Sequence, residues 1–249
     1  MSIIGLQLYS IRGEMEKDFF GSLEKVKQAG YNAVEFAGFY GHSAKELKSA
    51  LANMGLNPYS AHIELHKGDL AEIAAFTGEL GLKYVIAPWA PCDTLEDCRA
   101  SNAALKAAAP IFAAQGITVG YHNHWTEFVK YDGRYAIDIL MDGVDGVYQV
   151  DIGWVAKAGV DVLEYVRGLG DRVGPIHAKD MNADYFTRDP EDINVRIGDG
   201  VLDIKAIIEQ LRAAGTLSRG LIVEQEAFTM PMFEALAHNA RALREMVGS

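Results

Sequence analysis

The sequence has few cysteines and no long apolar run. Cys92 and Cys98 stand six positions apart, a spacing that matches neither a zinc site nor a redox motif, and their scarcity indicates a reducing compartment. No apolar segment reaches membrane-spanning length, and Met1 to Tyr9 is too short and too uncharged for a signal peptide. We therefore expect a cytoplasmic protein that does not enter a membrane.

Positive charge is also scarce. The chain carries 23 Lys and Arg residues against 34 Asp and Glu residues, which gives a formal net charge of −11. Binding to nucleic acid needs clustered Lys and Arg, so this composition argues against a nucleic-acid partner. Metal ions and neutral polar substrates are compatible with the charge.

Strand-like runs alternate along the chain with stretches whose apolar residues recur at helical spacing. The runs are Ile3–Tyr9, Ala33–Phe36, Tyr59–Leu65, Tyr84–Pro88, Thr118–His122, Val147–Ile152, Val173–Ala178 and Leu221–Glu224. With 249 residues, an apolar content of 49% and no long linker, this order predicts a single-domain (β/α)8 TIM barrel spanning residues 1–249. A doubly wound open sheet is the alternative, but no G-x-G-x-x-G motif follows the first run.

Polar side chains stand at the ends of these runs. In a TIM barrel the carboxyl ends of the strands share one mouth, where the active site lies. The pattern therefore predicts a polar cup at that mouth. Its expected members are Gln7, Glu35, His62, His122, Asp151, His177 and Glu224, with Trp89 as an apolar member.

Asp151, His177 and Glu224 form the strongest group within this cup. Two carboxylates and one imidazole suit a single divalent cation, Mn²⁺, Mg²⁺, Co²⁺ or Zn²⁺. Taken singly, each has a structural explanation as a helix cap, a core histidine or an ion-pair member. Their position at successive strand ends favours the metal site. From the fifth run, either His122 is a further ligand or Glu127 folds back to take that place.

Lys179 lies two residues after His177, so alternation along a strand places both on one face. A lysine there could stabilise an oxyanion on a substrate. The alternative is a structural pair between Lys179 and Asp151 or Asp180.

The remaining candidates are substrate contacts. We expect Glu35 and His62 to bind the hydroxyl groups of a polyhydroxylated substrate, although Glu35 could instead pair with His62 or Lys179. His124 shares a face with His122. Trp89 and Trp154, with Tyr9 and Phe39, could provide apolar faces for a sugar ring or could be ordinary core residues.

The sequence offers few residues that could bind a phosphate group on the substrate. The stretch Gly198–Asp203 looks like a loop that enters a helix and could hold an anion, but Asp199 would repel a phosphate there. Arg196 is the lone basic candidate near the mouth, so an unphosphorylated substrate is favoured.

Four motifs carry a resemblance to a known family. They are Tyr121-His122-Asn123-His124 with Glu127-Phe128, Val150-Asp151-Ile152-Gly153-Trp154, Ile176-His177-Ala178-Lys179-Asp180 and Gly198-Asp199-Gly200-Val201-Leu202-Asp203. Through them the chain resembles, over nearly its whole length, the xylose-isomerase-like TIM-barrel superfamily of sugar phosphate isomerases and epimerases, which is related to inosose dehydratases.

The resemblance implies a single divalent cation held by Glu, Asp, His and Glu at the ends of strands five to eight. Asp151, His177 and Glu224 match the last three of these ligands. His122 stands where the family usually has the first Glu, and Trp154 where many members have a second histidine. Barrels of this family often associate, so a homo-oligomer is also implied.

Together these features predict a metal-dependent isomerase or epimerase that acts on a small carbohydrate through an enediolate. Glu224, or Glu127 if it reaches the site, would remove the proton next to the carbonyl, and His122 or Lys179 would return it. Elimination from the same intermediate gives the first alternative, an inosose-type dehydratase or a 3-keto-glycoside lyase or hydrolase. A barrel that binds sugar without turnover is the second alternative.

Overall fold

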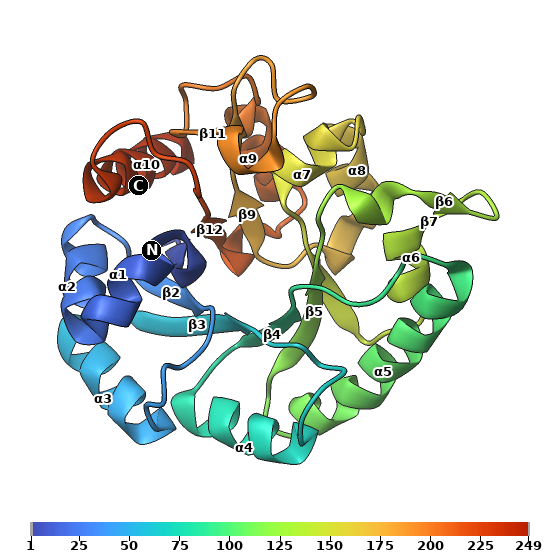
Figure 1. Ribbon diagram of the computed structural model, residues 1–249, viewed down its shortest axis with the longest axis horizontal. Helices are drawn as coiled ribbons and strands as arrows, with labels where there is room; N and C mark the ends of the chain where they lie inside the picture. Colours follow the sequence, from blue (N-terminus) through green and yellow to red (C-terminus); the bar gives the residue numbers. More distant parts are fainter. Residues whose placement is uncertain (1, 249) are drawn as a thin grey trace.

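In the computed structural model, which describes residues 2–248, the chain forms a parallel β-barrel surrounded by helices (Figure 1). Within that range the main sheet has eight strands, and their spatial order is β8-β5-β4-β3-β2-β1-β12-β9. The strands are β1 (Ile4–Gln7), β2 (Ala33–Phe36), β3 (Asn57–His62), β4 (Tyr84–Ala87), β5 (Thr118–His122), β8 (Gly146–Gln149), β9 (Ile176–Ala178) and β12 (Leu221–Val223).

The sheet closes between its two edge strands, β8 and β9. β1 pairs in parallel with both β2 and β12, so the first and last strands of the chain are neighbours. Parallel bridges from Tyr148 to Val173 and from Asp151 to His177 join the β8 edge to the β9 edge. The TIM-barrel prediction is therefore confirmed and the open-sheet alternative is wrong. The domain bounds 1–249 remain a prediction, because Met1 and Ser249 lie outside the described residues.

Helices cover the outside of the barrel (Figure 1). They are α1 (Arg12–Lys17), α2 (Phe19–Gln28), α3 (Ala44–Met54), α4 (Leu70–Leu80), α5 (Leu95–Ala113), α6 (Ala136–Leu140), α7 (Ile152–Lys157), α8 (Val162–Leu169), α9 (Ile204–Ala213) and α10 (Met232–Val247). Local sequence explains their ends. Ser43 and Thr94 form capping boxes at the starts of α3 and α5, and Gly55 ends α3 in the left-handed conformation, which glycine adopts without steric cost.

The barrel interior has an apolar layer beneath a polar one. Ala33 and Ile222 belong to a buried apolar cluster, and each lies two residues before a carboxylate, Glu35 or Glu224. Side chains two residues apart on a strand share a face, so each strand places an apolar residue low in the barrel and a polar one nearer the mouth. Gly120 allows the strands to approach, because a Cβ there would lie 2.5 Å from Ile86 Cδ1.

Two short antiparallel hairpins extend the structure beyond the expected elements. They are β6 (Lys130–Tyr131) with β7 (Arg134–Tyr135), and β10 (Asp180–Met181) with β11 (Asn194–Val195). The sixth barrel strand also ends earlier than predicted. Asp151 is the N-cap of α7 instead of the end of that strand, and its side chain accepts a hydrogen bond from Trp154 N.

Cys92 and Cys98 are joined in a disulfide where the segment after β4 folds back over the first turn of α5. Their scarcity therefore does not support the reducing compartment inferred from it. The Tyr131 hydroxyl holds the same segment by donating a hydrogen bond to the Cys92 carbonyl. Among the helices of residues 2–248, none is long and apolar enough to cross a membrane.

Candidate functional site

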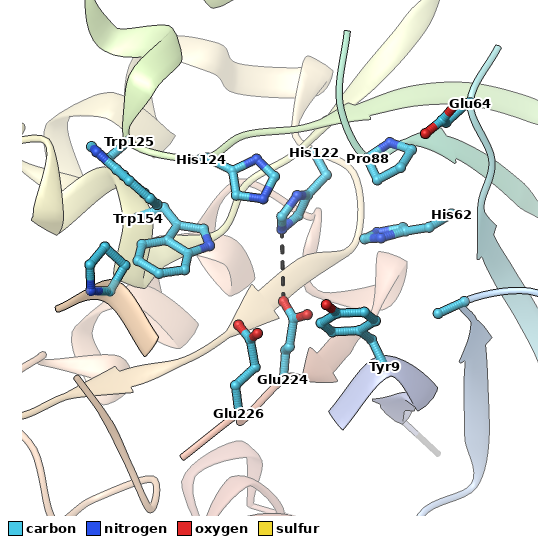
Figure 2. A pocket seen from close by; sticks show the side chains of 12 residues that line it. Tyr9, His62, Glu64, Pro88, His122, His124, Trp125, Trp154, Glu224 and Glu226 are labelled. Atoms are coloured by element: carbon cyan, nitrogen blue, oxygen red, sulfur yellow. Dashed lines mark ion pairs between the residues drawn. The ribbon is translucent and has the colours of Figure 1, made fainter. Parts of the chain in front are cut away.

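A cavity of about 480 Å³ opens at the carboxyl ends of the barrel strands. Figure 2 shows the side chains that line it, among them His122 and His124 from the end of β5 and Glu224 and Glu226 from the end of β12. Six residues expected at the site line this cavity: Tyr9, His62, His122, His124, Trp154 and Glu224. The expected metal ligands Asp151 and His177 and the expected catalytic residue Lys179 lie buried beside it, whereas Glu35, Glu127 and Trp89 lie elsewhere.

Four potential metal ligands meet at the inner end of the cavity. One ligand atom from each of His122, Asp151, His177 and Glu224 lies within 4.8 Å of the others, and all four residues are buried. His177 Nδ1 is 3.0 Å from Glu224 Oε2, and His122 Nε2 is 3.4 Å from Asp151 Oδ2. These residues come from β5, the start of α7, β9 and the end of β12, so the closed barrel is what brings them together.

Asp151 presents one oxygen to this cluster. Its Oδ1 accepts a hydrogen bond from Trp154 N at 2.9 Å, while its backbone N–H donates to Asn123 Oδ1 at 3.0 Å. The carboxylate is therefore a helix cap, as one explanation open from the sequence had it, and it is also a member of the cluster. Oδ2 is the oxygen that faces His122 and His177.

Glu35 lies beneath the cluster and does not line the cavity. Its side chain is fully buried. Its Oε1 is 2.5 Å from His177 Nε2 and 3.1 Å from His62 Nε2, so it orients His177 with Nδ1 toward the other ligands. Three further groups donate hydrogen bonds to it, from Gln7, Ser60 and Gln149. Burial would raise the pKa of Glu35, but the charges of His62 and His177 hold this pKa well below its usual range.

In the metal-free protein, the two histidines of the cluster differ in charge. Burial lowers the pKa of His122 to about 3, and the charge of His177 adds to that effect. Burial also opposes protonation of His177, but Glu35 and hydrogen bonds to Asp151 and Glu224 raise its pKa well above the ordinary value. His122 is therefore neutral, the form in which an imidazole binds metal.

The donor set fits a divalent cation. It contains two carboxylates whose pKa values are held low, one neutral imidazole and a second imidazole oriented by a carboxylate. The His122 Nδ1 atom is buried and has no hydrogen-bond partner among the described residues. A cation bound in the cluster would take the place of the proton on His177 Nδ1, because a histidine nitrogen must be deprotonated to coordinate a metal.

Lys179 is the other cation at this point. Its Nζ is fully buried and lies 3.3 Å from each of three carboxylate oxygens, on Asp151, Glu224 and Glu226. Nζ also stands 4.3 Å above the Trp154 ring. Burial opposes its charge, but the three carboxylates raise the pKa of Lys179 above its usual value. Of the two partners suggested by the sequence, Asp151 is the one present.

Of His122 and Glu127, the fold places only His122 in the cluster. His122 points into the cluster, whereas Glu127 is buried behind the fifth strand and accepts hydrogen bonds from Tyr121 OH and His124 N at 3.0 Å each. Glu127 therefore does not reach the cavity, and its expected role as the base needs correction. Its Oε1 is 3.7 Å from Nδ1 of His124, which does line the cavity.

Sequence reasoning missed several cavity residues, among them Glu64, Trp125 and Glu226. Glu226 lies two positions after Glu224, so the strand alternation that links His177 to Lys179 also signals that these two carboxylates share a face. Trp125 packs against Trp154 with ring centroids 4.8 Å apart, and both line the cavity. Trp89, by contrast, is 46% exposed and lies outside the cavity lining.

The fold and the site together define a TIM-barrel protein with a buried cluster of His, Asp and Glu at its mouth that could hold a metal. The family model described as "Xylose isomerase-like TIM barrel" matches residues 23–246, and the chain belongs to this family. No curated protein gives a significant match.

Solved structures share the fold. A sugar phosphate isomerase/epimerase from Parabacteroides distasonis superposes with a TM-score of 0.80 at 22% identity, covering 99% of this chain and 94% of that one. An IOLI protein with a bound zinc atom gives a TM-score of 0.78 at 15% identity, covering 99% and 98%. The probable 3-DHS dehydratase AsbF from Bacillus anthracis gives a TM-score of 0.74 at 13% identity, covering 98% of both chains.

Proposed function

We propose that this protein is a divalent-metal-dependent isomerase or epimerase of a sugar or keto-sugar. The observation that carries the proposal is the convergence of His122, Asp151, His177 and Glu224 within 4.8 Å at the wall of a cavity with aromatic faces. Two of the similar structures support it, since one is a sugar phosphate isomerase/epimerase and another binds zinc.

The bound cation would act as a Lewis acid that polarises a substrate carbonyl and eases loss of the neighbouring proton. Glu224 is ionised, because Lys179 and His177 hold its pKa low against the effect of burial, and it lines the cavity. It is therefore the base in this proposal. Glu127 no longer qualifies, because its carboxylate lies behind the strand.

The chain's other residues would orient and reprotonate the substrate. Lys179 is fully buried beside the cavity, so its positive charge would act through Glu224, 3.3 Å away, by keeping that carboxylate ionised. His124 lines the cavity with a third of its side chain exposed, so it is placed to return a proton. Trp125 and Trp154 would exclude water from one side of a sugar ring.

Hydrogen–deuterium exchange tests this proposal. The Mn²⁺-loaded protein is incubated in D₂O with ketoses, keto-glycosides and inososes, and deuterium next to the carbonyl is followed by NMR. We expect metal-dependent incorporation that falls by about 10²–10⁴ in Glu224→Gln, the usual contribution of a general base. Glu209→Gln, at an exposed site on α9, is the matched control and should exchange normally. Equal exchange by Glu224→Gln and Glu209→Gln would contradict the assigned base.

Elimination is the second candidate function. The cavity of about 480 Å³ falls in the range that encloses drug-sized ligands, so it has room for a glycoside or a cyclitol as well as a simple ketose. Loss of a β-substituent from the same intermediate would make the protein a dehydratase or a 3-keto-glycoside lyase. The NMR product separates the two, since elimination leaves an unsaturated carbonyl compound and isomerisation does not.

A further inference from the structure

The loop between β9 and α9 holds an internal anion. The Asp180 carboxylate is buried and accepts hydrogen bonds from the backbone N–H groups of Gly198, Gly200 and Leu202 at 2.9, 3.1 and 3.2 Å. In TIM barrels, the loops after the seventh and eighth strands frequently bind phosphate through such N–H groups. β9 is the seventh barrel strand here, so a side chain of the protein itself stands where a phosphate would bind.

This carboxylate is closely enclosed. A Cβ at Gly200 would collide with the Asp180 carboxylate and would lie 2.5 Å from the Met181 carbonyl oxygen. The loop therefore fits around the carboxylate at this point without leaving space for a ligand phosphate beside it.

The cavity itself is acidic. Glu64, Glu224 and Glu226 line it, and the lining residues include neither Lys nor Arg. A phosphate dianion in the cavity would meet carboxylates of its own sign, which costs free energy unless a cation compensates. Trp125 and Trp154 instead offer apolar faces to an uncharged ring.

The basic groups close to the cavity already have partners. Lys179 contacts three carboxylates, Lys67 pairs with Glu64, and Arg196 Nε donates to Asp199 at 2.6 Å. Arg12 lies over the Tyr9 ring at 4.1 Å and donates to the Tyr9 carbonyl oxygen. Of these four basic residues, Arg12 is the one whose contacts named here do not include a carboxylate. Arg12 is therefore the residue to test for phosphate binding.

We infer that the substrate is an uncharged, unphosphorylated sugar derivative and that Glu64 and Glu226 select against phosphate esters. The inference rests on the proposed function for the identity of the site, and it adds the charge of the substrate. It sets this chain apart from similar structures described as sugar phosphate isomerases/epimerases.

Calorimetric titration of the Mn²⁺-loaded protein tests the substrate charge without requiring turnover. Each ketose of a panel is compared with its own phosphate ester and its methyl glycoside. We expect the uncharged ligands to bind at least tenfold more tightly than the esters. In Glu64→Gln, ester affinity should rise several-fold while the affinity for uncharged ligands changes less than twofold, and Glu209→Gln should change neither.

Two outcomes would overturn the inference: tighter binding of the esters, particularly if lost in Arg12→Ala, or no binding of any uncharged member. The proposed function fails separately. Uncharged ligands that bind without deuterium exchange would contradict the enolisation chemistry and leave the inference intact. Exchange on a preferred phosphate ester would do the reverse.

The Asp180 site has its own test, measured as the unfolding temperature with and without inorganic phosphate. Inorganic phosphate should not shift the unfolding temperature of wild-type protein. Asp180→Ala should unfold at a lower temperature than wild type, and millimolar phosphate should restore part of that difference in unfolding temperature. Asp203→Ala, which removes the single hydrogen bond to Ala206 N, should show no such recovery. If Asp180→Ala does not fold, Asp180→Asn replaces it, since the amide keeps one acceptor. Two outcomes would contradict the assignment. In one, phosphate stabilises wild-type protein and Asp180→Asn abolishes that stabilisation. In the other, phosphate does not raise the unfolding temperature of Asp180→Ala.

Discussion

Lys179 is a buried ammonium group that would compete with a metal for the same oxygens. Its Nζ lies 3.3 Å from Asp151 Oδ2 and from Glu224 Oε2, the two carboxylate oxygens of the cluster that could hold a metal. Without a metal, this charge keeps the carboxylates compensated in a region that excludes water. With a metal, Glu226 and the Trp154 ring can retain the lysine at the cavity wall.

Lys179→Met should therefore destabilise the metal-free protein by about 3–5 kcal/mol, because it leaves buried carboxylates without a partner. Added Mn²⁺ should restore much of that free energy of unfolding and should bind the variant more tightly than wild type. Urea unfolding with and without Mn²⁺ measures both effects. Lys205→Met, at an exposed position on α9, is the control. Unchanged stability of metal-free Lys179→Met would contradict this account.

Glu127 stabilises the turn after β5 in a way that depends on pH. Burial would raise its pKa, but hydrogen bonds and charge from His124, with a hydrogen bond from Tyr121, lower it below 4.5. Because the folded pKa is the lower one, the unfolded chain takes up the proton first as the pH falls. The stabilisation is thus present above about pH 4.5 and is lost as the pH falls through the folded pKa.

Glu127→Gln should reduce the free energy of unfolding at pH 7 by about 1–3 kcal/mol, because a charged acceptor of buried hydrogen bonds is lost. The difference from wild type should shrink as the pH falls below about 4.5, since glutamine does not titrate. Urea unfolding over this pH range, with Glu209→Gln in parallel, provides the measurement. A difference that is constant with pH would show that the charge of Glu127 is not responsible.

At the scale of elements, the β9–α9 loop is organised around Asp180. The short hairpin of β10 and β11 starts from this residue, and the loop N–H groups close on its carboxylate before α9 begins at Ile204. Gly200 permits that approach. The loop is therefore specified by one carboxylate and one glycine, and it contributes Pro190 to the lining of the cavity.

Gly200→Ala should lower the free energy of unfolding by about 1–3 kcal/mol, because the added methyl group overlaps the Asp180 carboxylate. Gly168→Ala is the matched control. It lies in α8 with open space around its Cβ position and should instead gain about 0.5–1 kcal/mol. Thermal unfolding of both variants compares them, and a neutral Gly200→Ala would mean that the loop can open at this point.

For the whole molecule, the cluster of His122, Asp151, His177 and Glu224 lies where the two edges of the sheet are joined through isolated bridges. β8 and β9 are joined through isolated bridges, one of which links Asp151 to His177, two of the cluster residues. A cation held by both would cross-link the two edges of the sheet. The homo-oligomer implied by the resemblance remains a prediction at this scale.

Mn²⁺ should therefore raise the unfolding temperature of the whole barrel and slow amide exchange in β8 and β9. At one hundred times its dissociation constant, a ligand of the folded state adds about 2.7 kcal/mol. Calorimetry with Mn²⁺ and then with a chelator should show the gain and its reversal. His177→Ala should lose the response together with turnover, and a variant that kept full metal binding and activity would exclude this site.

The sequence by itself determined the barrel and the kinds of side chain at its mouth. Alternating strand and helix periods are local properties, so the strand ends and the polar residues upon them could be located without coordinates. Asp151, His177 and Glu224 were found in this way, since parallel strands in a closed barrel bring their carboxyl ends to one mouth.

Only the tertiary structure decided the direction and depth of each group. Glu35 is buried beneath His177, and Glu127 lies behind the fifth strand. Asp180 accepts hydrogen bonds from the N–H groups of the loop. Each of these placements depends on a partner from a distant strand or on a turn, and hydrogen-bond partners across a barrel leave no period in the sequence. The Cys92–Cys98 disulfide was decided in the same way, because a fold-back in the chain, rather than their spacing, brings the two sulfur atoms together.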